Sequence, residues 1–255
     1  SPKMLPLRAS RRALCAFGVL ALALTFSLWL PNPQEIVLLQ RAAVRAAIEE
    51  QIEELEQVRE EVAEAEGLTE ADREALLQAL EEAIAALEEG RATPEEAVAA
   101  LSETEQTLAQ LRDPGASAVR TGLENASESM ADSELTRDIS EALANGDYQK
   151  AAQALAAYGD DEGEVLTRDQ ELELARELAE AAEALAESDP ALAEQLAQAA
   201  EAIERGDIEE ARAAIREAAR RMEEAGERVE RQEALEGALA QVQEGRERIA
   251  QAGGA

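Results

Sequence analysis

Among the side chains that could catalyse a reaction or bind a metal ion, carboxylates are the most abundant in this sequence. The chain carries 56 Asp and Glu against 24 Lys and Arg, a formal net charge of −32. Their densest run is GDDEGE at residues 159–164, whose oxygens are of the kind that bind divalent cations. The run lacks the spacing of an EF-hand, because placing Gly163 at the sixth loop position puts Tyr158 first, where an acid is needed. We therefore expect no metal site and no cofactor.

The arrangement of these carboxylates does not indicate catalysis. Catalytic acids need a cleft that shifts their pKa, and helical seams of Ala and Leu build no deep cleft. Most glutamates fall on the polar sides of predicted helices, where pairs such as Glu217 with Arg221 stabilise the helix. The sequence has no His and only one cysteine, Cys15, which excludes catalytic triads, His-based zinc sites and disulfide frameworks. We expect the protein not to be an enzyme.

The negative charge also restricts the partners. A polyanion cannot gain affinity by displacing counterions from phosphates, which is the main driving force for binding DNA and RNA. We therefore expect no nucleic acid partner and only poor binding to anionic lipid headgroups.

An uncharged segment near the N-terminus predicts a membrane anchor. Residues 13–30 contain no charged side chain, and as a helix they would span about 27 Å, close to the hydrocarbon thickness of a bilayer. Trp29 ends the segment, where an amphipathic ring prefers the headgroup level, and Arg11 and Arg12 precede it. The flank at 1–12 holds four basic residues and no acid, which places the N-terminus in the cytoplasm.

The alternative to an anchor is a cleaved signal peptide. Ala21-Leu22-Ala23 offers a small-x-small cleavage site, but cleavage there would leave the apolar stretch LTFSLWL in water. We therefore favour a single-pass plasma-membrane protein that binds lipid through residues 13–30, with its acidic part outside the cytoplasm. Without the four basic residues of the flank, this part carries 20 bases and 56 acids, a charge of −36.

The part after the anchor predicts an all-α fold. Ala, Glu, Leu, Gln and Arg dominate it, and β-branched and aromatic residues are too few to build a sheet. We expect antiparallel helical hairpins or a coiled-coil-like bundle. The first helix carries a heptad seam, interrupted by Arg41 and Gln51, which we expect to contact a second chain or the following hairpin. The seam consists of Val37, Val44, Ile48, Leu55, Val58 and Val62.

Helix start and stop signals divide this part. Residues 34–112 predict a long amphipathic helix followed by a hairpin, and residues 135–250 predict a second helical array. Between them, residues 113–134 dilute the apolar pattern with Ser and Gly and predict a flexible linker. We expect residues 251–255 to be a disordered tail. Three glycines in the last helix, Gly226, Gly237 and Gly245, each disfavour helix by about 1 kcal/mol relative to Ala, so we expect it to bend or fray.

Local motifs mark several of the turns. Thr93 and Thr167 each begin a capping box, with Glu96 and Gln170 three residues later. The stretches ALANGDYQKAAQAL and AIERGDIEEARAAI resemble the central turn of tetratricopeptide-type hairpins, which implies helical hairpins at Gly146 and at Gly206. This resemblance covers about a tenth of the chain, and the bulky aromatic positions of such repeats are absent. We assign no family.

Together these patterns predict a non-enzymatic, membrane-anchored, extracytoplasmic helical scaffold or protein-docking module. Its partners would be membrane lipid, and other proteins or a second copy bound through helical faces. The alternative function is the sensory or regulatory half of a larger membrane protein, which would need further sequence upstream.

Overall fold

The computed structural model describes residues 33–65, 68–89, 93–160 and 166–254, with side chains from Leu38 onward. These residues form nine helices and no strand. The helices are α2 (Pro33–Glu64), α3 (Glu70–Glu89), α4 (Pro94–Gln110), α5 (Ala116–Met130), α6 (Arg137–Ala144), α7 (Tyr148–Ala157), α8 (Arg168–Leu185), α9 (Pro190–Arg205) and α10 (Ile208–Gly253). The prediction of an all-α fold is therefore confirmed for the described part of the chain.

The predicted anchor, residues 13–30, and its flanking Arg11, Arg12 and Trp29 lie outside the described residues. None of the helices that the structure describes is long and apolar enough to cross a bilayer.

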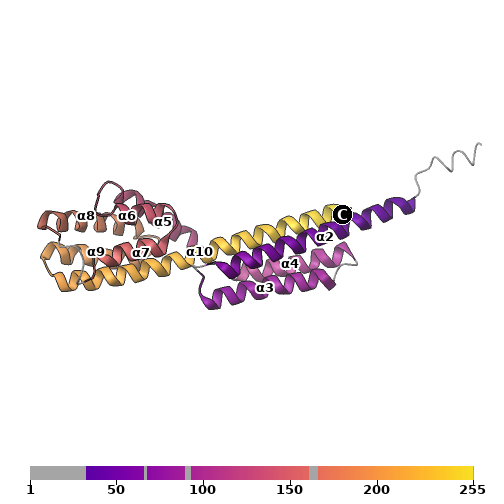
Figure 1. Ribbon diagram of the computed structural model, residues 1–255, viewed down its shortest axis with the longest axis horizontal. Coiled ribbons are helices and arrows are strands. Elements are labelled where there is room, and N and C mark those ends of the chain that lie inside the picture. The colour runs from indigo at the N-terminus through magenta and orange to yellow at the C-terminus, as the bar shows by residue number, and fades with distance from the viewer. Residues whose placement is uncertain (1–32, 66–67, 90–92, 161–165, 255) are drawn as a thin grey trace, which may run out of the picture.

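The helices build two bundles that share α10 (Figure 1). The four-helix bundle consists of α2, α3, α4 and the C-terminal half of α10, where Leu235, Leu239, Val242 and Ile249 are buried. The six-helix bundle consists of α5 to α9 and the N-terminal half of α10, up to Val229. Burial of these apolar faces against each other is the main stabilising contribution, because amphipathic helices are marginal alone.

The shared helix makes the molecule elongated. Helix α10 has 46 residues, which corresponds to a length of about 69 Å at 1.5 Å per residue. The two bundles lie end to end along it, and the N-terminal end of α2 projects beyond the four-helix bundle (Figure 1). The C-terminus of α10 lies beside α2, since the Gln40 side-chain amide donates a hydrogen bond to the Gly253 carbonyl.

Residues 113–134, predicted as a flexible linker, instead contain α5, a helix of 15 residues. Its hydroxyl side chains do not break the helix, because they donate to backbone carbonyls: Thr121 to Ser117 at 3.1 Å, for example, and Ser127 across to Ser140 at 2.9 Å. Val119, Leu123 and Met130 of α5 are fully buried in the six-helix bundle. Tertiary packing therefore overrides the weak local pattern.

The glycines of α10 do not interrupt the helix, although the sequence led us to expect that it would bend or fray. The helix runs unbroken to Gly253, so residues 251–253 are helical although they were predicted as part of a disordered tail. Two of the glycines lie where another helix approaches closely. A Cβ at Gly226 would lie 2.2 Å from the Tyr148 Cβ, and one at Gly245 would lie 1.8 Å from the Gln51 Oε1. Packing across these positions offsets the poor helix propensity of glycine.

Both predicted N-caps and both predicted glycine turns are present, and the reciprocal capping box is formed at Thr167. Thr167 and Gln170 form the complete capping box, and the Thr93 hydroxyl accepts a hydrogen bond from the Glu96 amide at 3.3 Å. Gly146 and Gly206 both adopt the left-handed conformation, with φ of 73° and 77°. Each lets its helix turn directly into the next, as the Gly-Asp pattern predicted.

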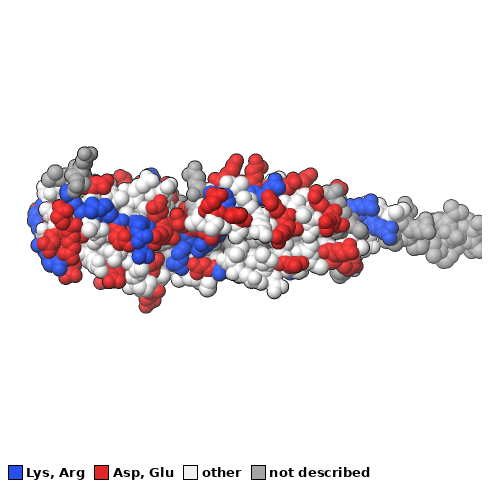
Figure 2. All heavy atoms as spheres, turned by 90° about the horizontal axis from the view of Figure 1, so that it is seen from below, with Lys and Arg blue, Asp and Glu red and all other residues white. Residues whose placement is uncertain are grey.

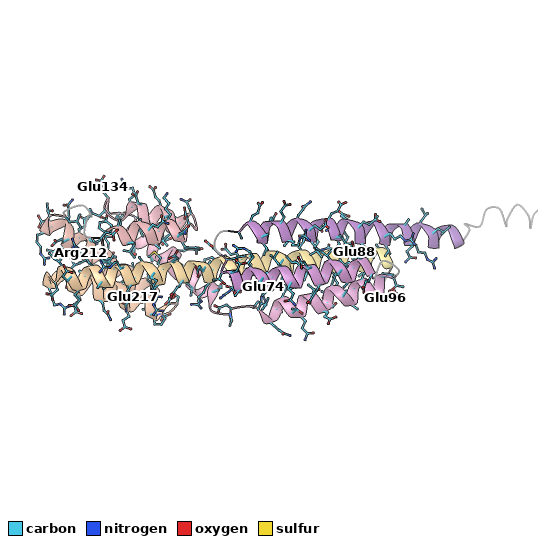
Figure 3. All side chains as sticks on the ribbon, turned by 60° about the horizontal axis from the view of Figure 1, so that its bottom comes forward. Glu74, Glu88, Glu96, Glu134, Arg212 and Glu217 are labelled. Atoms are coloured by element: carbon cyan, nitrogen blue, oxygen red, sulfur yellow. The ribbon has the colours of Figure 1, made fainter. Side chains whose placement is uncertain are left out.

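Charged side chains occur along the whole length of the face seen in Figure 2. Figure 2 shows carboxylates distributed over both bundles with arginines between them. Figure 3 shows the side chains as sticks. Its labelled Glu74 of α3, Glu96 of α4 and Glu134, which lies between α5 and α6, are all exposed. Many arginines pair along their own helix, as Arg221 does with Glu217 at 3.1 Å, so most of this surface is a solvated face.

Candidate functional site

The seam predicted on the first helix packs inside the chain. Val44, Ile48, Leu55 and Val62 are buried and Val58 is half-buried, in one apolar cluster with α3, α4 and the C-terminal half of α10. The side chain of Val37 lies outside the described residues. The structure therefore adds to the predicted hairpin contact a partner that the sequence did not suggest, α10, which lies about 190 residues away along the chain.

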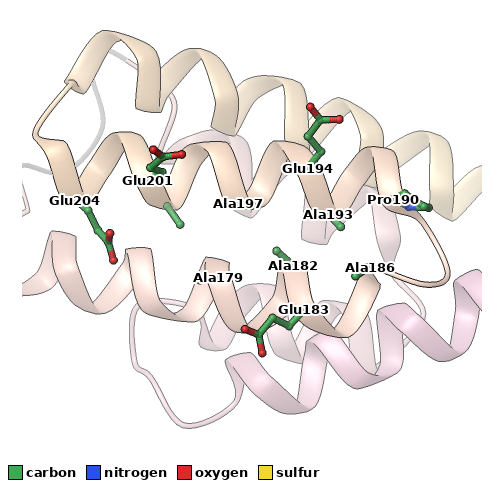
Figure 4. A pocket seen from close by; sticks show the side chains of 11 residues that line it. Ala179, Ala182, Glu183, Ala186, Pro190, Ala193, Glu194, Ala197, Glu201 and Glu204 are labelled. Carbon is green, nitrogen blue, oxygen red and sulfur yellow. The ribbon is translucent and has the colours of Figure 1, made fainter.

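The described surface is hollowed elsewhere, between α8 and α9 (Figure 4). These helices are antiparallel neighbours joined at Pro190, which occupies the first turn of α9 after the Asp189 cap. The groove has a volume of about 560 Å³ and a floor made of alanine side chains. Ala182 of α8 and Ala193 of α9 point toward each other across it (Figure 4). The other alanines of the floor are Ala179, Ala186, Ala197 and Ala200.

The alanines leave this hollow because they are too short to fill it. The larger apolar residues of both helices face the opposite way: Leu178, Leu185, Leu192 and Leu196 are fully buried in the six-helix bundle. On the groove side Ala186 and Ala197 are exposed and Ala179 is half-exposed. The helices that pack closely against this pair are α5 and α10, both from the core side. At the bottom of the groove Ala182, Ala193 and Ala200 are buried where α8 packs on α9. The more open residues above them form an apolar stripe that no described helix covers.

The rim of the groove is acidic. Glu183 of α8 and Glu194, Glu201 and Glu204 of α9 line it, and all four are exposed. No Lys or Arg lines it. Glu201 has a distant arginine partner, Arg205, at 3.6 Å. The lining therefore combines an apolar floor with a formal charge of −4.

The sequence does contain a pattern for this surface, but the more hydrophobic leucine stripes of the two helices are easier to recognise. The groove residues of α9 fall at Pro190, Ala193, Ala197 and Ala200, and those of α8 at Ala179, Ala182 and Ala186. Spacings of three and four are those of a helix face that packs on a partner. Ala182, Ala193 and Ala200 are buried in the contact between α8 and α9, and the remaining residues are more open. Sequence reasoning missed this second face, because alanine is common on exposed helical surfaces and by itself indicates no contact.

The most deeply buried carboxylate with a raised pKa lies outside the groove. Glu177 of α8 is only 5 % exposed, and burial, followed by repulsion from Glu180, raises its pKa above the usual 4.5. One of its oxygens, Oε2, has no hydrogen-bond partner. Glu173 and Asp132 raise this pKa further through their charges, and Arg176 acts to lower it. The described residues contain no group of three acidic, His or Cys side chains that could hold a metal ion.

A polar cluster holds the junction between the two bundles. Asp113, in the turn between α4 and α5, accepts hydrogen bonds from the Arg228 Nε and Nη2, both at 3.0 Å. Arg231, one turn further along α10, pairs with Asp72 of α3 at 2.9 Å and lies 3.9 Å from Asp113. Arg228 also lies 3.9 Å from Asp189, the cap of α9. The cluster therefore ties both bundles to the middle of α10.

Comparison with models of known protein families, with characterised proteins and with solved structures finds no match to this chain.

Proposed function

We propose that the protein is a membrane-anchored, extracytoplasmic scaffold that holds a docking surface away from the lipid and carries out no reaction itself. The observation that carries the proposal is the elongated arrangement of the two bundles on α10, with the end of α2 projecting from one tip (Figure 1). The proposed anchor, residues 13–30, precedes α2 directly in the sequence. The α8–α9 groove lies in the bundle at the other tip.

The composition of the projecting tip supports this orientation. Leu38 and Leu39 are 64 % and 67 % exposed, although large apolar side chains gain free energy from burial. Arg41 and Arg45 follow them and are the charged residues of α2 between residues 38 and 48. Figure 2 shows basic side chains at this tip, whereas the rest of the visible face carries carboxylates and basic side chains together. Exposed leucines next to arginines suit the interface between lipid and water.

The negative charge supports a scaffold that stands away from the membrane. Residues 31–255 carry 20 bases and 56 acids, so anionic headgroups would repel both bundles within about a Debye length of 8–10 Å. Attachment at the basic tip and repulsion elsewhere would favour an upright orientation of the long axis.

Vesicle flotation tests the anchor. The full-length chain, reconstituted with phosphatidylcholine vesicles, should float with the lipid and resist extraction by alkaline carbonate. Replacing Leu22 and Leu24 by arginine should release it, because each charge at the centre of a span costs about 3 kcal/mol. The matched control replaces two exposed alanines, Ala85 and Ala240, by arginine and should float like the wild type. A wild-type chain that stays dissolved without detergent would contradict the proposal.

Labelling tests the side of the membrane. In a chain with Cys15 replaced by serine, a cysteine at the exposed position Ala240 should react with a membrane-impermeant maleimide in right-side-out vesicles. The same variant should be protected in sealed inside-out vesicles until detergent is added. The reverse pattern would place both bundles in the cytoplasm.

A further inference from the structure

The α8–α9 groove has the pattern of a helix interface from which one helix is missing. Its open apolar residues are Ala179 and Ala186 on α8 and Pro190 and Ala197 on α9, seven residues or two turns apart on each helix. This spacing suits the side chains of a third helix that lies along the groove. Their short side chains would allow close approach of a partner backbone, and larger apolar side chains of that partner would fill the hollow. Because the groove is open along the direction of both helices, a helix fits it better than a compact ligand does (Figure 4).

The charges on the rim specify the chemistry of that helix. The lining offers four carboxylates and no cation, so any occupant that covers the alanines brings its own flanks close to the carboxylates. An acidic or neutral helix would partly desolvate them without bringing a new cation, whereas Lys or Arg of the occupant would pair with them.

We propose that this groove binds an amphipathic helix of another protein, with an apolar stripe flanked by basic residues. Glu194 and Glu201 are seven residues apart on α9, or about 10.5 Å along its axis. A helix lying along the groove presents cations with the same separation when they stand two turns apart. The matching sequence therefore has Leu, Met or Ala along one face and Lys or Arg at i and i+7 on the side toward α9. The inference rests on the scaffold function proposed above and names the chemistry of the partner.

A second copy of this chain is a poorer occupant. The surface is strongly acidic, with 56 carboxylates on the chain, and a second acidic surface would be repelled by the rim. The exposed leucines and arginines near Leu38 are at the opposite tip, and in an anchored molecule they would lie at the lipid, where the groove of a neighbour does not reach.

A designed peptide tests the proposal directly. The probe is a fluorescein-labelled helical peptide of about 18 residues, five turns long, with a Leu and Ala face and lysines two turns apart. Its anisotropy should rise on titration with the full-length chain in mild detergent. The same peptide with glutamate in place of lysine should bind at least about tenfold more weakly. Because the measurement is made in detergent, it does not depend on where or whether the chain is anchored.

Matched variants separate the groove from the general negative charge. Reversing the charge of two rim residues with Glu194→Lys and Glu201→Lys should weaken binding of the lysine peptide about tenfold or more. The control, Glu74→Lys with Glu81→Lys, has the same spacing and the same charge change on exposed positions of α3 and should shift the dissociation constant by less than about twofold. Equal weakening by both pairs would overturn the proposal, because it would show attraction to the acidic surface as a whole.

Filling the groove tests the apolar contact without changing charge. Ala197→Phe places a ring on the exposed floor and should abolish binding, whereas Ala85→Phe, at an exposed position of α3, should leave it intact. Circular dichroism confirms that both variants keep their helical content. No binding of the lysine peptide to the wild type, or unchanged binding to Ala197→Phe, would overturn the proposal. So would concentration-dependent dimerisation of the wild type that Ala197→Phe removes, since the occupant would then be a second copy.

Discussion

The Gln51 carboxamide lies directly over the Cα of Gly245, where α2 crosses the C-terminal half of α10. Gln51 is fully buried, and its Nε2 donates a hydrogen bond to the Gln241 carbonyl at 3.2 Å. A Cβ at position 245 would lie 1.8 Å from the Gln51 Oε1 and 1.9 Å from its Cδ. The polar residue that interrupts the seam of α2 and the glycine that weakens α10 are therefore two parts of one contact.

Alanine at position 245 should destabilise the protein. The added methyl group gains helix propensity but overlaps a side chain that is enclosed on all sides, so we expect Gly245→Ala to lower the free energy of unfolding by about 1–3 kcal/mol. Gly237 is the matched control, because it is exposed and a Cβ there meets nothing within 4 Å. Gly237→Ala should raise stability by about 0.5–1 kcal/mol. Urea unfolding followed by circular dichroism in mild detergent measures both, and equal effects would contradict the packing argument.

A double-mutant cycle should show that the cost comes from Gln51. In a Gln51→Ala background the carboxamide is gone, so Gly245→Ala should cost nothing or stabilise by up to about 1 kcal/mol. Gln51→Ala alone leaves a cavity and is expected to be destabilising. Two single effects that simply add would mean that Gln51 and Gly245 do not interact.

Helix starts and ends could be predicted from this sequence because their signals are local. The Thr167 capping box needs only four residues, and the left-handed Gly206 needs only the absence of a Cβ, so neither depends on distant contacts. The helix α5 could not be predicted in the same way. Its serines are tolerated because Ser127 meets Ser140 of α6, a contact that exists only after the hairpin has formed.

The sharing of α10 and the groove required the three-dimensional structure. An apolar stripe predicts that a helix is covered but not by which helix, so the seam at Ile48 and Leu55 gave no indication of a partner near Leu239. The groove was missed for a different reason. Ala193 and Ala197 are only weakly hydrophobic, so they did not stand out in the sequence. They lie on the groove side because the leucines of the same helices are buried on the opposite side, in the core.

Glu177 should make the protein less stable at neutral pH than at mildly acidic pH. Burial and the neighbouring Glu180 raise its pKa above 4.5, so the charged form is penalised in the folded state. Stability linked to this group is fully present below pH 4.5 and is lost as the pH rises through the raised pKa. Glu177→Gln should therefore raise the melting temperature at pH 7.5, with the gain vanishing below pH 4.5. Glu187→Gln, at an exposed position, is the control and should leave the melting temperature nearly unchanged. A gain that is independent of pH would contradict this.

Asp113 should stabilise the junction of the bundles, and its pH dependence should have the opposite sign. Burial acts to raise its pKa, but the hydrogen bond from the Gly115 amide and the charges of Arg228 and Arg231 outweigh burial and hold the pKa below the usual 3.8. Its contribution is therefore present above pH 3.8 and is lost as the pH falls through the lowered pKa.

Replacing Asp113 removes the carboxylate between two arginines that are partly withdrawn from water. We expect Asp113→Ala to lower the free energy of unfolding at pH 7 by about 1–3 kcal/mol, since Arg228 and the Gly115 amide lose their partner. Glu210→Ala is the control, because it breaks a similarly short but exposed ion pair with Arg205 and should cost less than about 0.5 kcal/mol. Hydrogen exchange gives a local readout: amides of α10 near Arg228 should exchange faster in Asp113→Ala, whereas those near Ile249, inside the four-helix bundle, should stay protected. Uniform loss of protection along α10 would show that the cluster stabilises the whole fold instead of the junction.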